Sequence, residues 1–144
     1  MGSLFVSNIE KFQEELSLVI NNNKIPEITL TSLGYGKYTH FNLEVSEGLQ
    51  KLHTAVFDLV TKYSAGEVVK ENFFEMHEAS SLIDWVNNYK ENSAYEKYHP
   101  HITLGIGITE IPLEFPIVFA PVSVGFFHLG IHGTCKKVIN TFIS

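Results

Sequence analysis

The chain has 144 residues, of which 44% are hydrophobic and 18% charged, the composition of a globular protein large enough to bury its own core. Its formal charge of −6, from 10 basic and 16 acidic side chains, disfavours a protein that coats duplex DNA, because DNA is itself a polyanion. Cys135 is the one cysteine, so no disulfide can form within the chain, and we expect a cytoplasmic location.

A single domain is expected over residues 1–144, in which residues 1–3 could be a cloning remnant. The longest apolar runs are far shorter than a membrane span, and no secretion signal is visible in the sequence. We therefore expect no membrane partner.

Apolar residues recur at helical spacing in three segments of the chain. Ser7 and Glu10 form a capping-box pattern at the start of the first segment, and Ser46 can cap the second. The helices are predicted over residues 8–22, over residues 46–63, and from residue 80 or 81 onward. In the third helix, the side chains predicted to face inward are Leu82, Trp85, Val86 and Tyr89.

Alternating polar and apolar residues between turn-forming sequences predict the strands. They cover residues 27–33, 38–45, 67–76, 101–108, 115–120, 122–130 and 136–143. The sequence GYGK makes a hairpin of the first two strands. Because helices and strands are mixed in this way, with a β-rich end, we predict an α+β fold.

Two of these strands, THFNLEV and PHITLGI, each contain a histidine, an apolar residue, a small hydrogen-bonding residue and a leucine in a row. Side chains alternate between the two faces of a strand, so His40 shares a face with Asn42, and His101 shares a face with Thr103. The apolar residues of each strand should then face a core. We expect two lobes, each contributing one such strand, and two imidazoles that face one groove if the strands lie side by side.

Paired imidazoles suit the cleavage of a phosphodiester. A neutral histidine can take a proton from the attacking oxygen while a protonated histidine gives one to the leaving oxygen. Histidine has a reference pKa of about 6.5, so both forms exist near neutral pH. The hydroxyl of Thr103 and the amide of Asn42 can donate hydrogen bonds to the phosphate oxygens. This chemistry needs no metal, and we expect no cofactor.

The longer motif HPHITLG resembles the second signature of the two-histidine (2H) phosphoesterases, the superfamily of LigT-like RNA ligases and cyclic phosphodiesterases, and THFNLEV resembles the first. The resemblance implies a compact two-lobed fold, with antiparallel β-sheets around a central groove and helices packed on the outside. It also implies that His40 and His101 are the catalytic acid–base pair and that Thr103 binds phosphate. Asn42 departs from the family pattern, which has threonine or serine at that position.

Aromatic and basic side chains near the expected groove are candidates to bind the rest of the substrate. Aromatic rings stack on unpaired bases, and the candidates for this role are Tyr35, Tyr38, Tyr98 and Phe127. Lys37 lies in the turn before Tyr38, which shares the face of His40. The substrate-binding residues that we predict are Thr103, Asn42, Tyr38, Phe127 and Lys37.

We therefore expect a metal-independent, monomeric phosphodiesterase that hydrolyses a small RNA-derived substrate, either a 2′,3′-cyclic phosphate or a 2′,5′-linked oligonucleotide. One alternative is a viral or phage enzyme that degrades oligonucleotide second messengers of host defence, such as 2′,5′-oligoadenylate or a cyclic dinucleotide. Another is a non-catalytic nucleotide-binding module of the same fold, in which Asn42 marks a lost activity. A third is a metal-binding regulator that uses His128, His132 and Cys135, since imidazole and thiolate are zinc ligands. The two motifs are alike, so the acid and the base stay unassigned.

Overall fold

The computed structural model describes residues 1–74, 80–108, 111–130 and 133–143. Its α-helices are α1 (Ile9–Asn23), α2 (Glu47–Tyr63), α3 (Ser80–Asn87) and α4 (Tyr89–Ser93). Its strands are β1 (Ile28–Gly34), β2 (Tyr38–Leu43), β3 (His101–Ile106), β4 (Ile117–Phe119), β5 (Ser123–Leu129) and β6 (Cys135–Ile143). The α+β class predicted from the sequence is confirmed.

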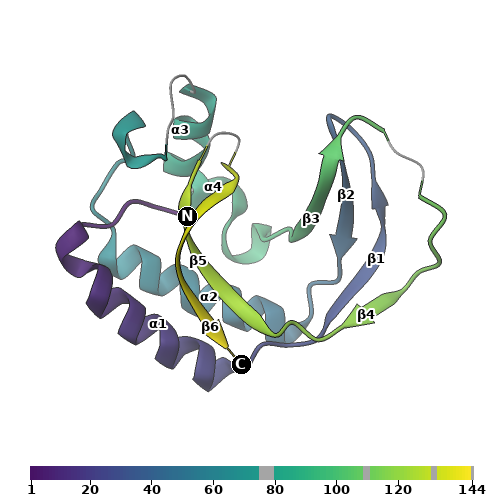
Figure 1. The fold of residues 1–144 in the computed structure, drawn as a ribbon, viewed down its shortest axis with the longest axis horizontal. Coiled ribbons are helices and arrows are strands. Elements are labelled where there is room, and N and C mark those ends of the chain that lie inside the picture. The colour runs from purple at the N-terminus through teal and green to yellow at the C-terminus, as the bar shows by residue number, and fades with distance from the viewer. Residues whose placement is uncertain (75–79, 109–110, 131–132, 144) are drawn as a thin grey trace.

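The strands form two antiparallel sheets (Figure 1). One sheet has four strands in the order β3-β2-β1-β4, and the other pairs β5 with β6. The predicted hairpin is confirmed, because β1 pairs antiparallel with β2. The two histidine-bearing strands, β2 and β3, are neighbours in the four-stranded sheet although α2, α3 and α4 separate them in the sequence.

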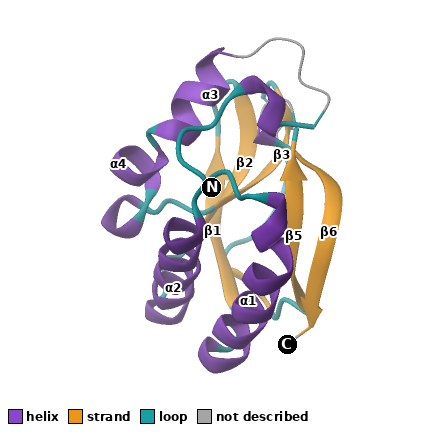
Figure 2. Cartoon of the chain, turned by 90° about the vertical axis from the view of Figure 1, so that its left-hand side faces the viewer, coloured by secondary structure: helices purple, strands orange, loops and turns teal. Residues whose placement is uncertain are grey.

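The main hydrophobic core lies between α1, α2 and the β5–β6 sheet. The helical periodicity of α1 places Phe12, Leu16 and Ile20 on one face, where they are buried against Leu59 of α2 and Phe142 of β6. Figure 2 shows the helices gathered on one side of the molecule with the strands behind them. The core therefore belongs to the helical half of the molecule rather than to the four-stranded sheet.

Cap geometry confirms one prediction for the helices and contradicts another. Ser46 caps α2, since its hydroxyl accepts a hydrogen bond from the backbone N–H of Leu49 at 3.3 Å. The capping box predicted for Ser7 is wrong. Residues Val6–Asn8 form a short 3-10 turn, so Ser7 lies inside helical backbone, and α1 begins after Asn8 without a side-chain cap.

The strand predicted over residues 67–76 is also wrong within the described part of that segment. Lys70–Asn72 forms a 3-10 turn instead. The side-chain amide of Asn87 accepts from the N–H of Val68 at 2.6 Å and donates to its carbonyl at 3.1 Å. Asn87 thus makes both hydrogen bonds that a neighbouring strand would have made with Val68. Residues 75 and 76 lie outside the described chain.

The inward face predicted for the third helix is partly confirmed. Leu82 and Val86 are buried in a small second core with Val68 and Phe73. Trp85 is exposed instead, and its ring lies edge-to-face against that of Tyr89 with a centroid distance of 5.6 Å. At the start of the chain, Ser3 is buried and donates to the carbonyl of Gly66 at 3.1 Å, so the residues set aside as a possible remnant pack against the fold.

Two expectations about the motif strands are corrected by the sheet pairing. The strands were expected to come from separate lobes, but β2 and β3 belong to one sheet. Each was also expected to bury an apolar face, but every residue of β3 is exposed, because β3 forms an edge of the sheet and no helix of the main core lies on it. Across the described ranges, we find no helix with the length and apolar character needed to span a membrane.

Candidate active site on the β2–β3 pair

The pairing of β2 with β3 brings the four motif side chains together on one face of the sheet. His40 lies opposite Thr103, and Asn42 lies opposite His101. Residues directly opposite one another in an antiparallel pair point to the same face. The four side chains therefore mark the corners of a rectangle, with the two histidines on one diagonal.

A β-bulge makes this arrangement possible. The register shifts between Thr39, which pairs with Gly105, and His40, which pairs with Thr103, so Leu104 is the additional residue on β3. Beyond the bulge, the buried Thr39 ties the end of β3 to β2, since its hydroxyl donates to the carbonyl of Gly107 at 2.6 Å. The bulge sets the phase in which His101 and Thr103 share the face of His40.

The two imidazoles lie next to each other. Their ring centroids are 5.5 Å apart and the ring planes meet at 69°, which is an edge-to-face arrangement. His101 is exposed and His40 is half-buried. Because the rings are in contact, a phosphate group would be bound over the pair, on its solvent side, and would not fit between the rings in this arrangement.

Both imidazoles have the same kind of backbone partner. Nδ1 of His40 lies 3.4 Å from the carbonyl oxygen of Tyr38, and Nδ1 of His101 lies 3.3 Å from that of His99. A carbonyl can only accept, so each long hydrogen bond favours the tautomer that carries its proton on Nδ1. Nε2 is then the atom that each neutral imidazole offers to a substrate. His99, expected to be a loop histidine, contributes through its backbone.

Asn42, the position that departs from the family pattern, is held toward β1. Its side-chain amide donates to the hydroxyl of Ser32 at 3.1 Å, and Ser32 is its cross-strand partner. The amide has a second N–H that can donate to another acceptor. Sequence reasoning missed Ser32, whose place opposite Asn42 depends on the register of the β1–β2 hairpin.

Gly34 is a second residue that sequence reasoning missed. It lies opposite His40 on β1, and the imidazole of His40 leans over it so closely that a Cβ on residue 34 would lie 2.3 Å from Nε2. Real Cβ atoms do not approach another atom so closely. The present position of the ring therefore requires glycine at residue 34.

The other candidates to bind substrate lie in different parts of the fold. Tyr38 is half-buried on β2, two residues before His40, and Nζ of Lys37 lies 5.4 Å from the centre of its ring. Phe127 lies on β5 of the other sheet, where it lines a cavity with Ser3 and Leu4. The ring of Tyr98 is stacked on that of His53 at 3.8 Å, so it packs against α2 instead of standing free for a base.

A metal centre built from His128, His132 and Cys135 gains no support. Nε2 of His128 lies 2.9 Å from the carbonyl oxygen of Asn72, and Cys135 is a free, exposed cysteine. His132 lies outside the described residues. Within the ranges that the structure describes, no three side chains of the metal-binding types are grouped closely enough to hold an ion.

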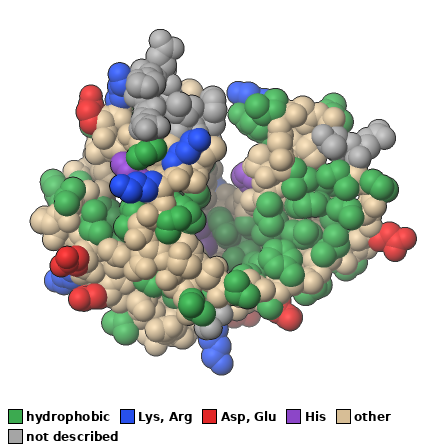
Figure 3. Space-filling view, viewed as in Figure 1, with side chains coloured by type: hydrophobic (Ala, Val, Ile, Leu, Met, Phe, Trp, Pro, Cys, Tyr) green, Lys and Arg blue, Asp and Glu red, His purple; other side chains and the backbone are tan. Residues whose placement is uncertain are grey.

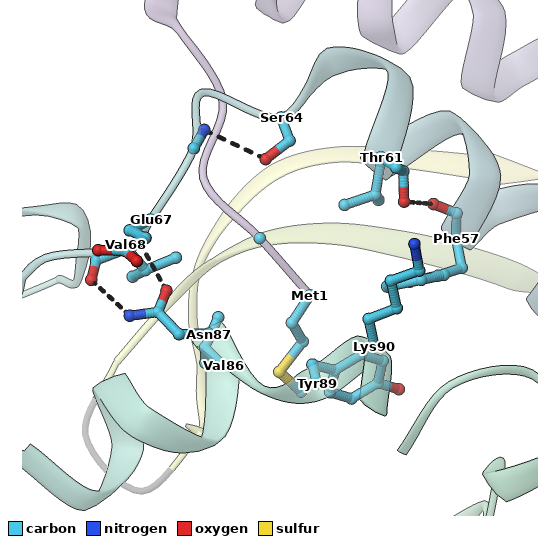
Figure 4. A pocket seen from close by; sticks show the side chains of 13 residues that line it. Met1, Phe57, Thr61, Ser64, Glu67, Val68, Val86, Asn87, Tyr89 and Lys90 are labelled. Atoms are coloured by element: carbon cyan, nitrogen blue, oxygen red, sulfur yellow. Dashed lines mark hydrogen bonds between the residues drawn. The ribbon is translucent and has the colours of Figure 1, made fainter. Parts of the chain in front are cut away.

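A cavity of about 230 Å³ lies between the start of the chain, α2 and the α3–α4 region (Figure 4). Met1, Tyr89 and Lys90 are among the residues that line it, and the hydrogen-bonded Asn87 lies at its wall. No residue of β2 or β3 lines this cavity. It is thus separate from the histidine pair, which lies on an open sheet face.

The chain matches no family model, no curated protein and no solved structure.

Proposed function

We propose that the chain is a metal-independent phosphodiesterase of the two-histidine kind that acts on a small RNA-derived substrate. The observation that supports this most strongly is the placement of His40 and His101 on neighbouring strands, 5.5 Å apart, with Nδ1 of each against a carbonyl oxygen. With Nδ1 turned to the backbone, Nε2 of each ring is the atom that can exchange a proton with a substrate, as paired acid–base catalysis requires. The substrate is a 2′,3′-cyclic phosphate or a 2′,5′-linked oligonucleotide.

The proposed reaction on a cyclic phosphate is a single displacement. Nε2 of one neutral histidine takes a proton from water as the water oxygen attacks phosphorus. The bond from phosphorus to one ribose oxygen breaks, and Nε2 of the other, protonated histidine gives that oxygen a proton. The product is a phosphomonoester beside a free hydroxyl. The two histidines exchange protonation states during the step and return to their starting forms through solvent.

The charge that develops on the phosphate oxygens needs hydrogen-bond donors on the same face of the sheet. The hydroxyl of Thr103, directly opposite His40, and the second N–H of Asn42, directly opposite His101, can supply them. Because Nδ1 of each histidine has a backbone carbonyl as its partner, the geometry supports either assignment of acid and base.

The two-lobed arrangement of the family is part of this proposal. Figure 3 shows a hollow between the half of the molecule that β1–β4 form and the helical half, which supports a substrate groove beside the sheet.

A reducing cytoplasmic location is also part of the proposal, and the single, unpaired Cys135 is consistent with such a compartment.

The direct test is hydrolysis of a nucleoside 2′,3′-cyclic phosphate and of 2′,5′-linked oligoadenylate by the purified protein in EDTA. We expect turnover of at least one substrate, and a loss of about 100-fold or more in kcat for His40→Ala and for His101→Ala. His99→Ala is the matched control, because it keeps the backbone carbonyl through which His99 contacts His101. Full retention of both substrates, or equal rates in all three variants, contradicts the proposal.

Initial rates on cyclic dinucleotides should be compared with the initial rates on these two substrates. The comparison separates an enzyme that destroys second messengers of host defence from one that processes RNA ends. The chemistry at phosphorus is the same in both, so the binding of the rest of the substrate decides between them. A rate preference of about tenfold or more, equivalent to about 1.4 kcal/mol, would assign the substrate class.

The alternative of a binding module without activity rests on Asn42, whose amide is already bonded to Ser32. The substitution Asn42→Thr restores the family residue at this position. If the wild-type protein is active, we expect this change to lower its rate, because the bond to Ser32 that positions the donor is lost. Activity that appears only in Asn42→Thr would instead establish the binding module.

A further inference from the structure

The face of the sheet that carries the histidines continues by one more cross-strand pair. Tyr38, at the start of β2, lies opposite Ile106, at the end of β3. Side chains alternate along a strand, so Tyr38 is on the face of His40, two residues later. Residues opposite one another in an antiparallel pair point to the same face, so Ile106 is on that face as well. We call Tyr38 and Ile106 the apolar pair.

The β-bulge on β3 is what brings Ile106 to the histidine face. In a regular strand, Thr103 and Gly105 would share a face and Ile106 would point away from the histidines. Leu104 is the additional residue of the bulge, so Gly105 and Ile106 exchange faces. Alternation in the sequence alone would therefore place Ile106 on the wrong side of the sheet.

The apolar pair presents an aromatic ring beside a branched aliphatic side chain. Ile106 is 84% exposed, whereas Tyr38 is half-buried on β2. Unpaired bases stack on exposed aromatic side chains of this kind. Successive positions on one face of a strand are about 7 Å apart, so the apolar pair lies one such step from His40 and Thr103. A ribose can span this step between a phosphate held at the histidines and the base that it carries.

The charges at the two ends of the histidine face differ in sign. Lys37 is exposed at the end of the apolar pair, and its Nζ lies 5.4 Å from the centre of the Tyr38 ring. At the other end, beyond Asn42, β2 is followed by the exposed Glu44. A phosphorylated ligand is attracted by the lysine and repelled by the glutamate. The charges therefore favour a nucleotide that extends from the histidines toward Tyr38.

We infer that the apolar pair binds the base of the substrate and that Ile106 is a specificity-determining residue. The inference rests on the proposed function, because that function places a phosphate at the histidines. Stacking uses the face of a base and not its hydrogen-bonding edge, so the apolar pair accepts any base. A purine binds more tightly than a pyrimidine because it buries more area. The substrate is therefore a nucleotide for which the presence of a base matters more than its identity.

Methyl NMR of the isoleucine-labelled protein tests this inference without turnover. Adenosine 3′-monophosphate, a product of cyclic phosphate hydrolysis, should shift the δ1 methyl resonance of Ile106 upfield, because a stacked adenine ring lies over it. Ribose 5-phosphate has a phosphate but no base, and it should leave that resonance in place. Ile102 is the matched control, because it lies on the same strand opposite Phe41 and faces away from the histidines. No shift at Ile106, or an equal shift at Ile102, overturns the inference.

Steady-state kinetics on adenosine 2′,3′-cyclic phosphate separate binding of the base from chemistry. Ile106→Ala and Tyr38→Ala should raise KM by at least about fivefold and change kcat by less than about twofold, because the proton-transfer atoms stay in place. Ile102→Ala should leave both constants unchanged. Ile102 and Ile106 are both exposed, so neither substitution should disturb the fold. A fall in kcat at unchanged KM for Ile106→Ala overturns the inference.

The proposed function and this inference can fail separately. If the wild type turns over neither proposed substrate but adenosine 3′-monophosphate shifts Ile106 and not Ile102, the reaction is wrong and the base site stands as that of a binding module. If the wild type is active but Ile106→Ala and Ile102→Ala have the same KM, the reaction stands and the base site is wrong.

Discussion

The imidazole of His40 occupies space that only a glycine at residue 34 leaves free. Gly34→Ala would place a methyl group 2.3 Å from Nε2, so the ring must rotate away from its present position beside His101. We expect kcat to fall by at least about tenfold with little change in KM, because the proton-transfer atom moves while the phosphate donors stay. The ¹⁵N chemical shifts of the His40 imidazole should change as well.

Gly36→Ala is the matched control for this change. Gly36 lies in the turn of the same hairpin, and a Cβ there would meet no atom within 4 Å. The NMR readout does not depend on activity, so it tests the positioning role even if no substrate is found. Imidazole shifts that are the same in Gly34→Ala and Gly36→Ala would show that Gly34 does not position His40.

The features of the site that depend on a single strand, such as which side chains share a face, could be predicted from the sequence. The two-residue period placed His101 with Thr103 and His40 with Asn42 on common faces, and the pairing confirms this placement. Ser32 and Gly34 could not be found in the same way, because their partners on β2 depend on the register that the turn sets between β1 and β2. The period of a single strand does not determine that register.

The helix α2 holds the segment that leads into β3. The ring of His53 is stacked on Tyr98 with a centroid distance of 3.8 Å, and the side chain of Gln50 donates to the carbonyl of Tyr95 at 2.9 Å. These contacts fix the chain just before His101. They also explain why Tyr98, a candidate for base stacking by its sequence position, is part of the scaffold.

Burial of His53 lowers its pKa below 6.5, because the charged form loses solvation. The unfolded chain then binds more protons between the lowered pKa and 6.5, so the free energy of unfolding should increase with pH across that window and level off above it. His53→Phe keeps an aromatic ring for Tyr98 and removes the titration, so this pH dependence should become weaker.

Urea unfolding at several pH values between about 4.5 and 8 measures this effect. His99→Phe is the control, since His99 is exposed and its removal should leave the dependence intact. If the wild type and His53→Phe show the same pH dependence, His53 does not carry it.

The helices and most strands follow from local patterns, and the failures involve contacts distant in sequence. The periodicity of α1 and α2 is strong enough to fix their existence, and their bounds agree with prediction within a residue or two. Residues Lys70–Asn72 were expected in a strand. Asn87 of α3 instead makes hydrogen bonds to both backbone groups of Val68, and no local signal reveals that contact. The order of strands in a sheet also depends on contacts distant in sequence, which is why β2 and β3 were assigned to separate lobes.

The molecule as a whole combines a well-packed helical half with a thin sheet that carries the candidate site. Catalytic groups on regular strands are held more rigidly than groups on loops, which suits a reaction that depends on two Nε2 positions. The sheet has little core of its own, so the histidine face lies on a structure open to solvent. The site could be anticipated from its two motifs, whereas the exposure of β3 could not, because it depends on what the rest of the chain covers.

The central claim is that His40 and His101 exchange protons with one substrate, and the pH dependence of kcat/KM for a 2′,3′-cyclic phosphate tests it most directly. Across roughly pH 5 to 9, we predict a bell-shaped profile for the wild type, since one histidine must be neutral and the other protonated. His40→Ala should lose one arm of the bell and His101→Ala the other. Each variant should also lose most of the rate. A flat wild-type profile, or a bell that both variants retain, would contradict the account.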